Sequence, residues 1–104
     1  MSKRNVFTAI LVNTSRGAVV DQDALFHALV ENQIMGAALD VTTPEPISSD
    51  HPLITLRNCI VVPHIASASK QTRENMSIRA AENLLAGIRG EQLPYCVNPE
   101  VYSD

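Results

Sequence analysis

The chain has 104 residues, which is one domain at most and small for a protein that holds a dinucleotide by itself. Hydrophobic residues make up 45% and the net charge is -3 without a long basic run, so the composition excludes a disordered chain and argues against nucleic-acid binding. Its apolar runs are too short to span a membrane, and its first residues lack the apolar run of a signal peptide, so we expect a cytoplasmic protein. Its two cysteines form no metal-binding pattern, so we expect reduced thiols and no metal.

Two apolar segments in the first half predict buried strands, at residues 8–13 and 35–41. Neither segment alternates between apolar and polar residues, which is typical of strands covered on both faces. Gly17 permits a sharp turn after the first strand, and Asp21 is a good N-cap for a helix that runs to about residue 32. The apolar stripe of this helix is formed by Leu25, Ala28 and Leu29.

The segment from Thr42 to Cys59 contains three prolines, which predicts an irregular connection with one helical turn near residues 53–56. A third short strand is expected at residues 59–62. Pro63 cannot donate a backbone hydrogen bond, so the strand should end there and release His64 into a loop.

A long helix is predicted to begin after Ser69 as its N-cap and to stop at Gly90. Its core face is expected to consist of Met76, Ala80, Leu84 and Ile88. Residues 91–104 contain two prolines and no periodicity, so we expect an extended C-terminal tail. This order of elements predicts an α/β fold with a parallel sheet of about three strands and a long C-terminal helix.

Polar residues that interrupt the apolar segments fall at the carboxyl ends of the predicted strands. Arg16 follows the first strand, Asp40 and Glu45 follow the second, and His64 follows the third. The carboxyl ends of parallel strands share one edge of the sheet, where ligands bind. Random placement would scatter these residues over both edges, so we expect them to form a shared site.

The chemistry of three of these side chains suits the reduction of a 2-oxo acid. The guanidinium of Arg16 can hold a carboxylate and its neighbouring carbonyl oxygen together. A carboxylate that bonds to a histidine fixes its ring and stabilises its protonated form, so Glu45 could prepare His64 to act as an acid. The alternative for each residue is a plain structural one: an arginine on a surface turn, a glutamate in a solvated loop and a histidine at a strand end.

Several ordered motifs carry a resemblance to a known family. They are Asn13-Thr14-Ser15-Arg16-Gly17, Val20-Asp21, Ala37-Ala38-Leu39-Asp40-Val41, Pro44-Glu45-Pro46 and Pro63-His64-Ile65-Ala66-Ser67. At these residues the chain resembles the D-isomer-specific 2-hydroxyacid dehydrogenases. It is most similar to their glyoxylate/hydroxypyruvate reductase branch, through the Thr-Pro-Glu-Pro stretch, the His-Pro-Leu at residues 51–53 and the segment 83–90.

The resemblance implies an oxidoreductase and assigns roles to individual residues. His64 would donate the proton, Glu45 would pair with it, and Arg16 would orient the substrate. Asp40 would lie near the nicotinamide or the substrate. The cofactor pocket would be lined by Thr14, Ser15, Asp40, Ala66 and Ser67.

The resemblance also implies a cofactor, a substrate and partners. The cofactor would be NAD or NADP, with NADPH favoured by the branch, and the substrate a small 2-oxo or 2-hydroxy acid. The complete enzyme would be a cytoplasmic homodimer, without nucleic-acid or membrane partners. Residues 1–90 would form the second half of a Rossmann-like NAD(P)-binding domain, followed by the tail at 91–104.

Two features depart from the family pattern. Ala66 stands where the family usually has glycine, and its methyl group could crowd the nicotinamide. The chain has four glycines, and none has the Gly-x-Gly-x-x-Gly spacing that brings the backbone close to a pyrophosphate. We therefore expect the C-terminal portion of a reductase, inactive by itself; the alternatives are a non-catalytic interaction module or a relative of the family's transcriptional corepressors.

Overall fold

The computed structural model describes residues 7–103, and the chain divides after Ala66 into two compact units. The first unit contains the sheet and one helix, and the second contains a long helix and the C-terminal residues. The predicted functional division after residue 90 stays a prediction. Within residues 7–103, no helix combines the length and the apolar composition needed to cross a bilayer.

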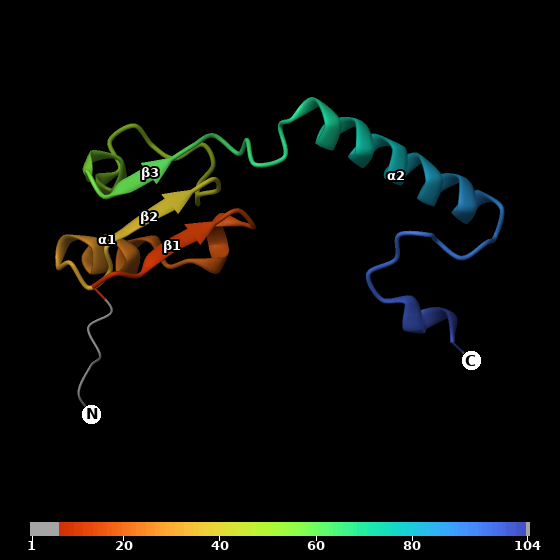
Figure 1. The fold of residues 1–104 in the computed structure, drawn as a ribbon, viewed down its shortest axis with the longest axis horizontal. Coiled ribbons are helices and arrows are strands. Elements are labelled where there is room, and N and C mark those ends of the chain that lie inside the picture. Colours follow the sequence, from red (N-terminus) through yellow and green to blue (C-terminus); the bar gives the residue numbers. More distant parts are fainter. Residues whose placement is uncertain (1–6, 104) are drawn as a thin grey trace. The chain divides into compact units, whose positions relative to one another are not determined.

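The three strands of the first unit form one parallel sheet in the order β1-β2-β3, as Figure 1 shows. They are β1 (Ile10–Asn13), β2 (Gly36–Leu39) and β3 (Cys59–Val61). Their ends are in register, with Asn13 beside Leu39 and Leu39 beside Val61. The predicted parallel sheet is confirmed, and the loops after its three strands leave from one edge.

One face of the sheet packs against α1 (Gln22–Val30). The carboxylate of Asp21 accepts hydrogen bonds from the backbone of the first helical turn, which confirms it as the N-cap. Leu25 and Leu29 are buried against the sheet. Burial in the same cluster raises the pKa of the Cys59 thiol.

The opposite face of the sheet is uncovered in the first unit, so the prediction of strands covered on both faces is wrong there. Ile10, Val12 and Ile60 are 58%, 65% and 64% exposed. An unbroken apolar run shows that both faces are apolar, but it does not show whether the same chain segment covers both. The helical turn predicted near residues 53–56 is present at Pro52–Thr55, and its Leu53 is fully buried.

The second unit is built on α2 (Lys70–Ile88), whose ends lie where the sequence places them. The Ser69 hydroxyl accepts a hydrogen bond from the Thr72 backbone, and Gly90 takes the left-handed conformation just after the helix. The predicted core face is wrong, because Met76, Ala80, Leu84 and Ile88 are all exposed. Ala86 is buried instead, and its backbone carbonyl accepts a hydrogen bond from the Glu91 N–H.

The C-terminal residues are not an extended arm along their whole length, which corrects that prediction. The amide of Asn83 bonds both the N–H and the carbonyl of Tyr95, each at 3.0 Å, and ties the tail to α2. Arg79 lies 4.9 Å over the Tyr95 ring. Pro99–Tyr102 then form a short 3-10 helix. These contacts could not be predicted from the sequence, because they depend on one asparagine side chain and not on a periodic apolar pattern.

Candidate active site

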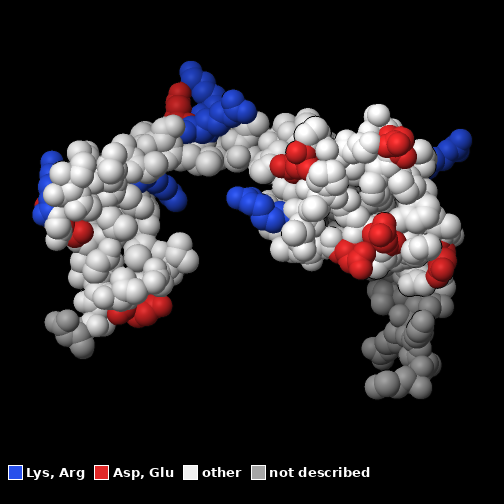
Figure 2. Space-filling view, turned by 180° about the vertical axis from the view of Figure 1, so that it is seen from behind, with Lys and Arg blue, Asp and Glu red and all other residues white. Residues whose placement is uncertain are grey.

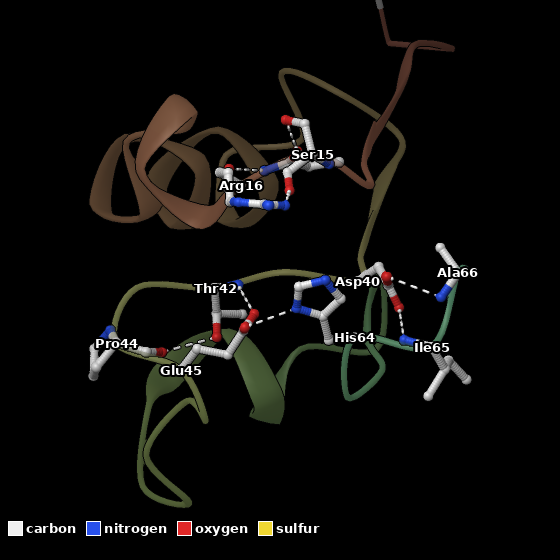
Figure 3. A network of polar contacts seen from close by, with 10 residues as sticks. Ser15, Arg16, Asp40, Thr42, Pro44, Glu45, His64, Ile65 and Ala66 are labelled. Carbon is white, nitrogen blue, oxygen red and sulfur yellow. Dashed lines mark hydrogen bonds and ion pairs between the residues drawn. The ribbon is translucent and has the colours of Figure 1, made fainter. Parts of the chain in front are cut away.

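Glu45 and His64 meet at the carboxyl edge of the sheet, on the loops that follow β2 and β3. The Nδ1 atom of His64 lies 2.9 Å from Oε2 of Glu45, as Figure 3 shows. The two side chains are 45% and 41% exposed, so a small molecule can reach them. The structure thus brings together the pair that the resemblance implied. The bond to Nδ1 leaves the other ring nitrogen, Nε2, on the side of the ring away from Glu45.

Glu45 is held as an ionised carboxylate. The hydrogen bond from His64 is the main cause that lowers its pKa, and a hydrogen bond from the Thr42 backbone to Oε1, at 3.1 Å, lowers it further. Desolvation opposes these two bonds, and the positive charges of His64 and Arg16 lower the pKa by smaller amounts. A glutamate in this state is an acceptor for the hydrogen bond from the Nδ1–H of His64.

Arg16 lies on the β1–α1 loop, close enough to Glu45 for its charge to lower the pKa of that carboxyl. Its backbone carbonyl accepts a hydrogen bond from the buried Asn13 side chain at 2.9 Å, and Asn13 also accepts from the Ser15 backbone. Its guanidinium donates to the Ser15 carbonyl at 2.7 Å and is exposed. Within residues 7–103 Arg16 forms no ion pair, so the guanidinium remains available to an anion.

Asp40 is buried and holds the backbone that carries His64. Its two carboxylate oxygens accept hydrogen bonds from the backbone of Ile65, at 2.7 Å, and of Ala66, at 3.0 Å. Its carbonyl accepts from the His64 N–H at 2.9 Å. His64 itself has a φ of 55°, an uncommon conformation for a residue other than glycine, and these bonds hold it there. Figure 3 shows Asp40 and Glu45 on opposite sides of the histidine.

Two hollows lie next to this pair of loops. The larger, of about 420 Å³, is the Glu45–His64 hollow; beside these two residues, it is lined by Thr42, Pro46, Ile47, Ile54, Val61, Val62 and Pro63. The smaller, of about 210 Å³, is the Asp40 hollow on the uncovered face of the sheet; its lining is Val12, Thr14, Ala38, Leu39, Asp40, Ile60, Val62, Ile65 and Ala66. The His64 loop therefore separates a larger space beside the ion pair from a smaller, apolar one.

The Asp40 hollow contains three of the five residues predicted to line a cofactor pocket, Thr14, Asp40 and Ala66. Ser15 is not part of its lining; the Ser15 hydroxyl donates to the Asn13 side chain at 2.9 Å. Ser67 belongs to the second unit. A flat apolar ring with a polar substituent would suit a space of this size and lining, so the residues present fit the ring end of a nicotinamide cofactor.

Sequence reasoning missed the residues that hold these side chains in place. Asn13 is part of a family motif and ends an apolar run, but the sequence assigns its side chain no role; in the structure this buried amide bonds the Arg16 carbonyl. Thr42 carried no signal; its backbone bonds to Glu45 and its hydroxyl donates to the Pro44 carbonyl at 2.9 Å. Such contacts depend on how two loops approach each other, which a single sequence does not reveal.

The sequence also matches known proteins. Residues 4–66 match the family model described as D-isomer specific 2-hydroxyacid dehydrogenase, NAD binding domain. The chain is 59% identical over 87 residues to the glyoxylate reductase/hydroxypyruvate reductase of Mus musculus, covering 84% of this chain and 26% of that protein. It is 58% identical over 94 residues to the glyoxylate reductase of Korarchaeum cryptofilum, covering 90% of this chain and 28% of the relative. The chain thus spans 26% to 28% of the length of these curated relatives.

Solved structures give the same result. An NADPH-dependent glyoxylate/hydroxypyruvate reductase from Sinorhizobium meliloti, in complex with NADP and malonate, matches with a TM-score of 0.77 at 36% identity, over 89% of this chain and 29% of that one. D-lactate dehydrogenase with NAD+ from Lactobacillus jensenii matches with a TM-score of 0.71 at 32% identity, over 88% of this chain and 32% of that one. These matches confirm the Rossmann-like fold class. The chain therefore belongs to the D-isomer specific 2-hydroxyacid dehydrogenases, with residues 4–66 in their NAD binding domain.

Proposed function

We propose that this chain supplies the acid–base and substrate-orienting part of an NAD(P)H-dependent reductase that acts on small 2-oxo acids of the glyoxylate or hydroxypyruvate type. The observation that carries the proposal is the 2.9 Å contact between Glu45 and His64 beside Arg16, at one edge of a parallel sheet. The relatives named above as glyoxylate and hydroxypyruvate reductases support the choice of substrate class.

His64 is the proposed proton donor. Glu45 accepts a hydrogen bond from Nδ1 and stabilises the positive charge of the ring. Nε2 can then carry the proton that is given to the substrate carbonyl oxygen. When hydride adds to the carbonyl carbon, this oxygen gains negative charge and takes the proton. The product is a 2-hydroxy acid and a neutral histidine, which regains its proton from solvent because it is exposed.

Arg16 is the proposed substrate anchor. A 2-oxo acid has a carboxylate and a carbonyl oxygen on adjacent carbons, and a guanidinium can donate to both at once. The bond from Asn13 fixes the backbone of Arg16; its exposed guanidinium uses one nitrogen for the Ser15 carbonyl and has further N–H groups for an anion. Binding at two points would orient the carbonyl relative to His64.

The proposed cofactor is NAD or NADP, with NADPH favoured; when bound, its nicotinamide supplies the hydride. Thr14, Asp40 and Ala66 would line the space for the ring, and Ser15 and Ser67 are proposed as further contacts. The Sinorhizobium meliloti reductase in complex with NADP supports the preference. The proposed setting is a cytoplasmic homodimer, which light scattering of the complete enzyme would test.

The test is a complete reductase that carries residues 1–104 in place of its own matching segment. His64→Ala should lower turnover of hydroxypyruvate by roughly a hundredfold to ten-thousandfold, because a general acid is lost. Affinity for NADPH, measured by calorimetry, should stay unchanged. His27→Ala is the matched control, since His27 is exposed on α1. Near-normal turnover of the His64 variant would remove this residue from the mechanism.

A second variant separates binding from proton transfer. Arg16→Lys keeps the charge but loses the two-pronged donor geometry, so the KM for hydroxypyruvate should rise roughly tenfold or more with a smaller effect on kcat. Arg57→Lys is the control, because Arg57 is the other arginine in residues 7–66. An unchanged KM would contradict the assignment of Arg16 as substrate anchor.

A further inference from the structure

The loop that carries Glu45 is bonded to the first turn of α1 by one side chain. Nε2 of Gln22 donates to the Thr43 carbonyl at 3.0 Å, and Oε1 of Gln22 accepts from the Thr43 N–H at 2.7 Å. Thr43 lies two residues before Glu45, whereas Gln22 lies 21 residues earlier in the chain. A single amide thus satisfies both backbone groups of one residue, as a neighbouring strand would.

The backbone next to this contact is packed without room for a side chain. A Cβ atom at Gly17 would lie 2.1 Å from the Thr42 carbonyl carbon and 2.2 Å from its oxygen. Thr42 in turn donates its N–H to Glu45. The segment that carries Arg16 and the segment that carries Glu45 therefore touch backbone to backbone at Gly17, and Gln22 ties them together one helical turn further along.

We propose that Gln22 is a positioning residue, which holds the Thr42–Glu45 loop so that the Glu45 carboxylate reaches His64 and keeps a fixed place relative to Arg16. This inference rests on the proposed function. Gln22 lines neither the Glu45–His64 hollow nor the Asp40 hollow, and its side-chain bonds go to the Thr43 backbone, through which it acts on the pair. Residues 43–46 are exposed, and the other side-chain bonds that restrain the loop come from Thr42 within it and from His64.

The ionisation of Glu45 provides a direct readout of this role. The charged groups that face Glu45 are His64 and Arg16, and the bonds from His64 and Thr42 lower its pKa. Gln22 is neutral, so its removal changes the pKa of Glu45 only by letting the loop move. Loss of two neutral hydrogen bonds should reduce the population of the held loop by roughly threefold to tenfold, and the pKa of Glu45 should rise toward the ordinary value for glutamate.

The experiment titrates the Glu45 carboxyl carbon by NMR in the 104-residue chain. Gln22→Met, which keeps the length of the side chain, and Gln22→Ala should both raise the midpoint and speed hydrogen exchange of the Thr43 amide. Gln33→Met is the matched control, because Gln33 is exposed and bonds only to Glu31 through its side chain. An unchanged midpoint in both Gln22 variants overturns the proposal, and so does unfolding of both where the parent is folded.

A kinetic arm connects the loop to catalysis. In the complete reductase that carries this segment, Gln22→Met should lower kcat roughly threefold to tenfold, with little change in the affinity for NADPH. If the proposed function is wrong, the parent enzyme will show no turnover, and the NMR titration of Glu45 will still test the role of Gln22. A normal kcat together with a raised Glu45 midpoint would overturn the link between Gln22 and catalysis.

Discussion

The ionisation of Glu45 is set by hydrogen bonds rather than by burial. The bond from His64 has the largest effect on its pKa, the bond from Thr42 has the next largest, and the opposing effect of desolvation is smaller than either. Both side chains of the pair are more than a third exposed, so solvent screens their attraction and the pair contributes little to stability. Its main effect is to orient the ring of His64, which is what an acid catalyst requires.

This pair should therefore respond to acid. The folded pKa of Glu45 lies below its unfolded one, so the stabilisation is fully present above the unfolded value and is lost as pH falls through the folded value. The free energies of unfolding of Glu45→Gln and of the parent, measured with urea, should differ slightly at neutral pH and become equal in acid. Asp50→Asn, which alters an exposed carboxyl bonded to Ser48, is the comparison. A difference that grows in acid would contradict the pairing.

The positions of Arg16, Glu45 and His64 at one edge could be predicted, because the end of each parallel strand fixes where its loop begins. The residues that support them could not. Gly17 was interpreted as a turn residue, but its lack of a side chain is needed for contact with Thr42. That contact joins two loops that are far apart in sequence, so a local sequence pattern cannot predict it.

At the scale of elements, the loop after β3 depends on one buried carboxylate. Asp40→Asn replaces an acceptor of two backbone bonds with an amide whose NH2 group opposes one of the donors. We expect a loss of about 1–3 kcal/mol in the free energy of unfolding and faster hydrogen exchange at Ile65 or Ala66. Asp23→Asn on the exposed first turn of α1 should change much less. Equal effects would show that Asp40 does not hold the loop.

The amino end of α2 offers a second test at this scale. Ser69→Ala removes the acceptor for the Thr72 N–H and should destabilise the helix by about 1 kcal/mol. Circular dichroism and exchange of the Thr72 amide would measure the loss. Ser77→Ala is the control, since its hydroxyl donates to the Arg73 carbonyl within the helix and caps no free N–H group. No change in exchange at Thr72 would rule out the cap.

Helix ends were predictable to within a residue or two because caps are local: Asp21, Ser69 and Gly90 all act where the sequence places them. Core faces were less predictable. The stripe of α1 is buried at Leu25 and Leu29, yet the corresponding stripe of α2 is exposed. Periodicity shows which side of a helix is apolar, whereas burial depends on a partner surface elsewhere.

At the scale of the whole molecule, Arg16 stands out by its charge. Residues 7–66 carry six carboxylates and two arginines, Arg16 and Arg57. On the unit that contains the sheet, Figure 2 shows more red than blue surface on the face in view. Within residues 7–66, the guanidinium at the sheet edge is therefore the cation placed to attract the proposed anionic substrate toward the Glu45–His64 pair.

The chain of 104 residues should not by itself bind NADH or NADPH tightly or reduce hydroxypyruvate. It contains no Gly-x-Gly-x-x-Gly turn for the pyrophosphate, and the Asp40 hollow has room for a ring but not for a whole dinucleotide. Its exposed apolar side chains, such as Val12 and Ile60, should promote self-association. Calorimetry and light scattering would measure both. Micromolar binding with turnover would contradict this prediction.

The boundary after Ala66 places Arg16, Glu45 and His64 in the same compact unit. The bonds that hold them, from Asn13, Gln22 and Asp40, also lie within it. The site is thus a transferable module: exchanging residues 1–66 between relatives would move the proposed acid, its partner carboxylate and the proposed substrate anchor together. Chimeras joined after Ala66 should have the pH dependence of turnover of the parent that supplies residues 1–66. A junction between Glu45 and His64 would instead combine the carboxylate of one parent with the histidine of the other.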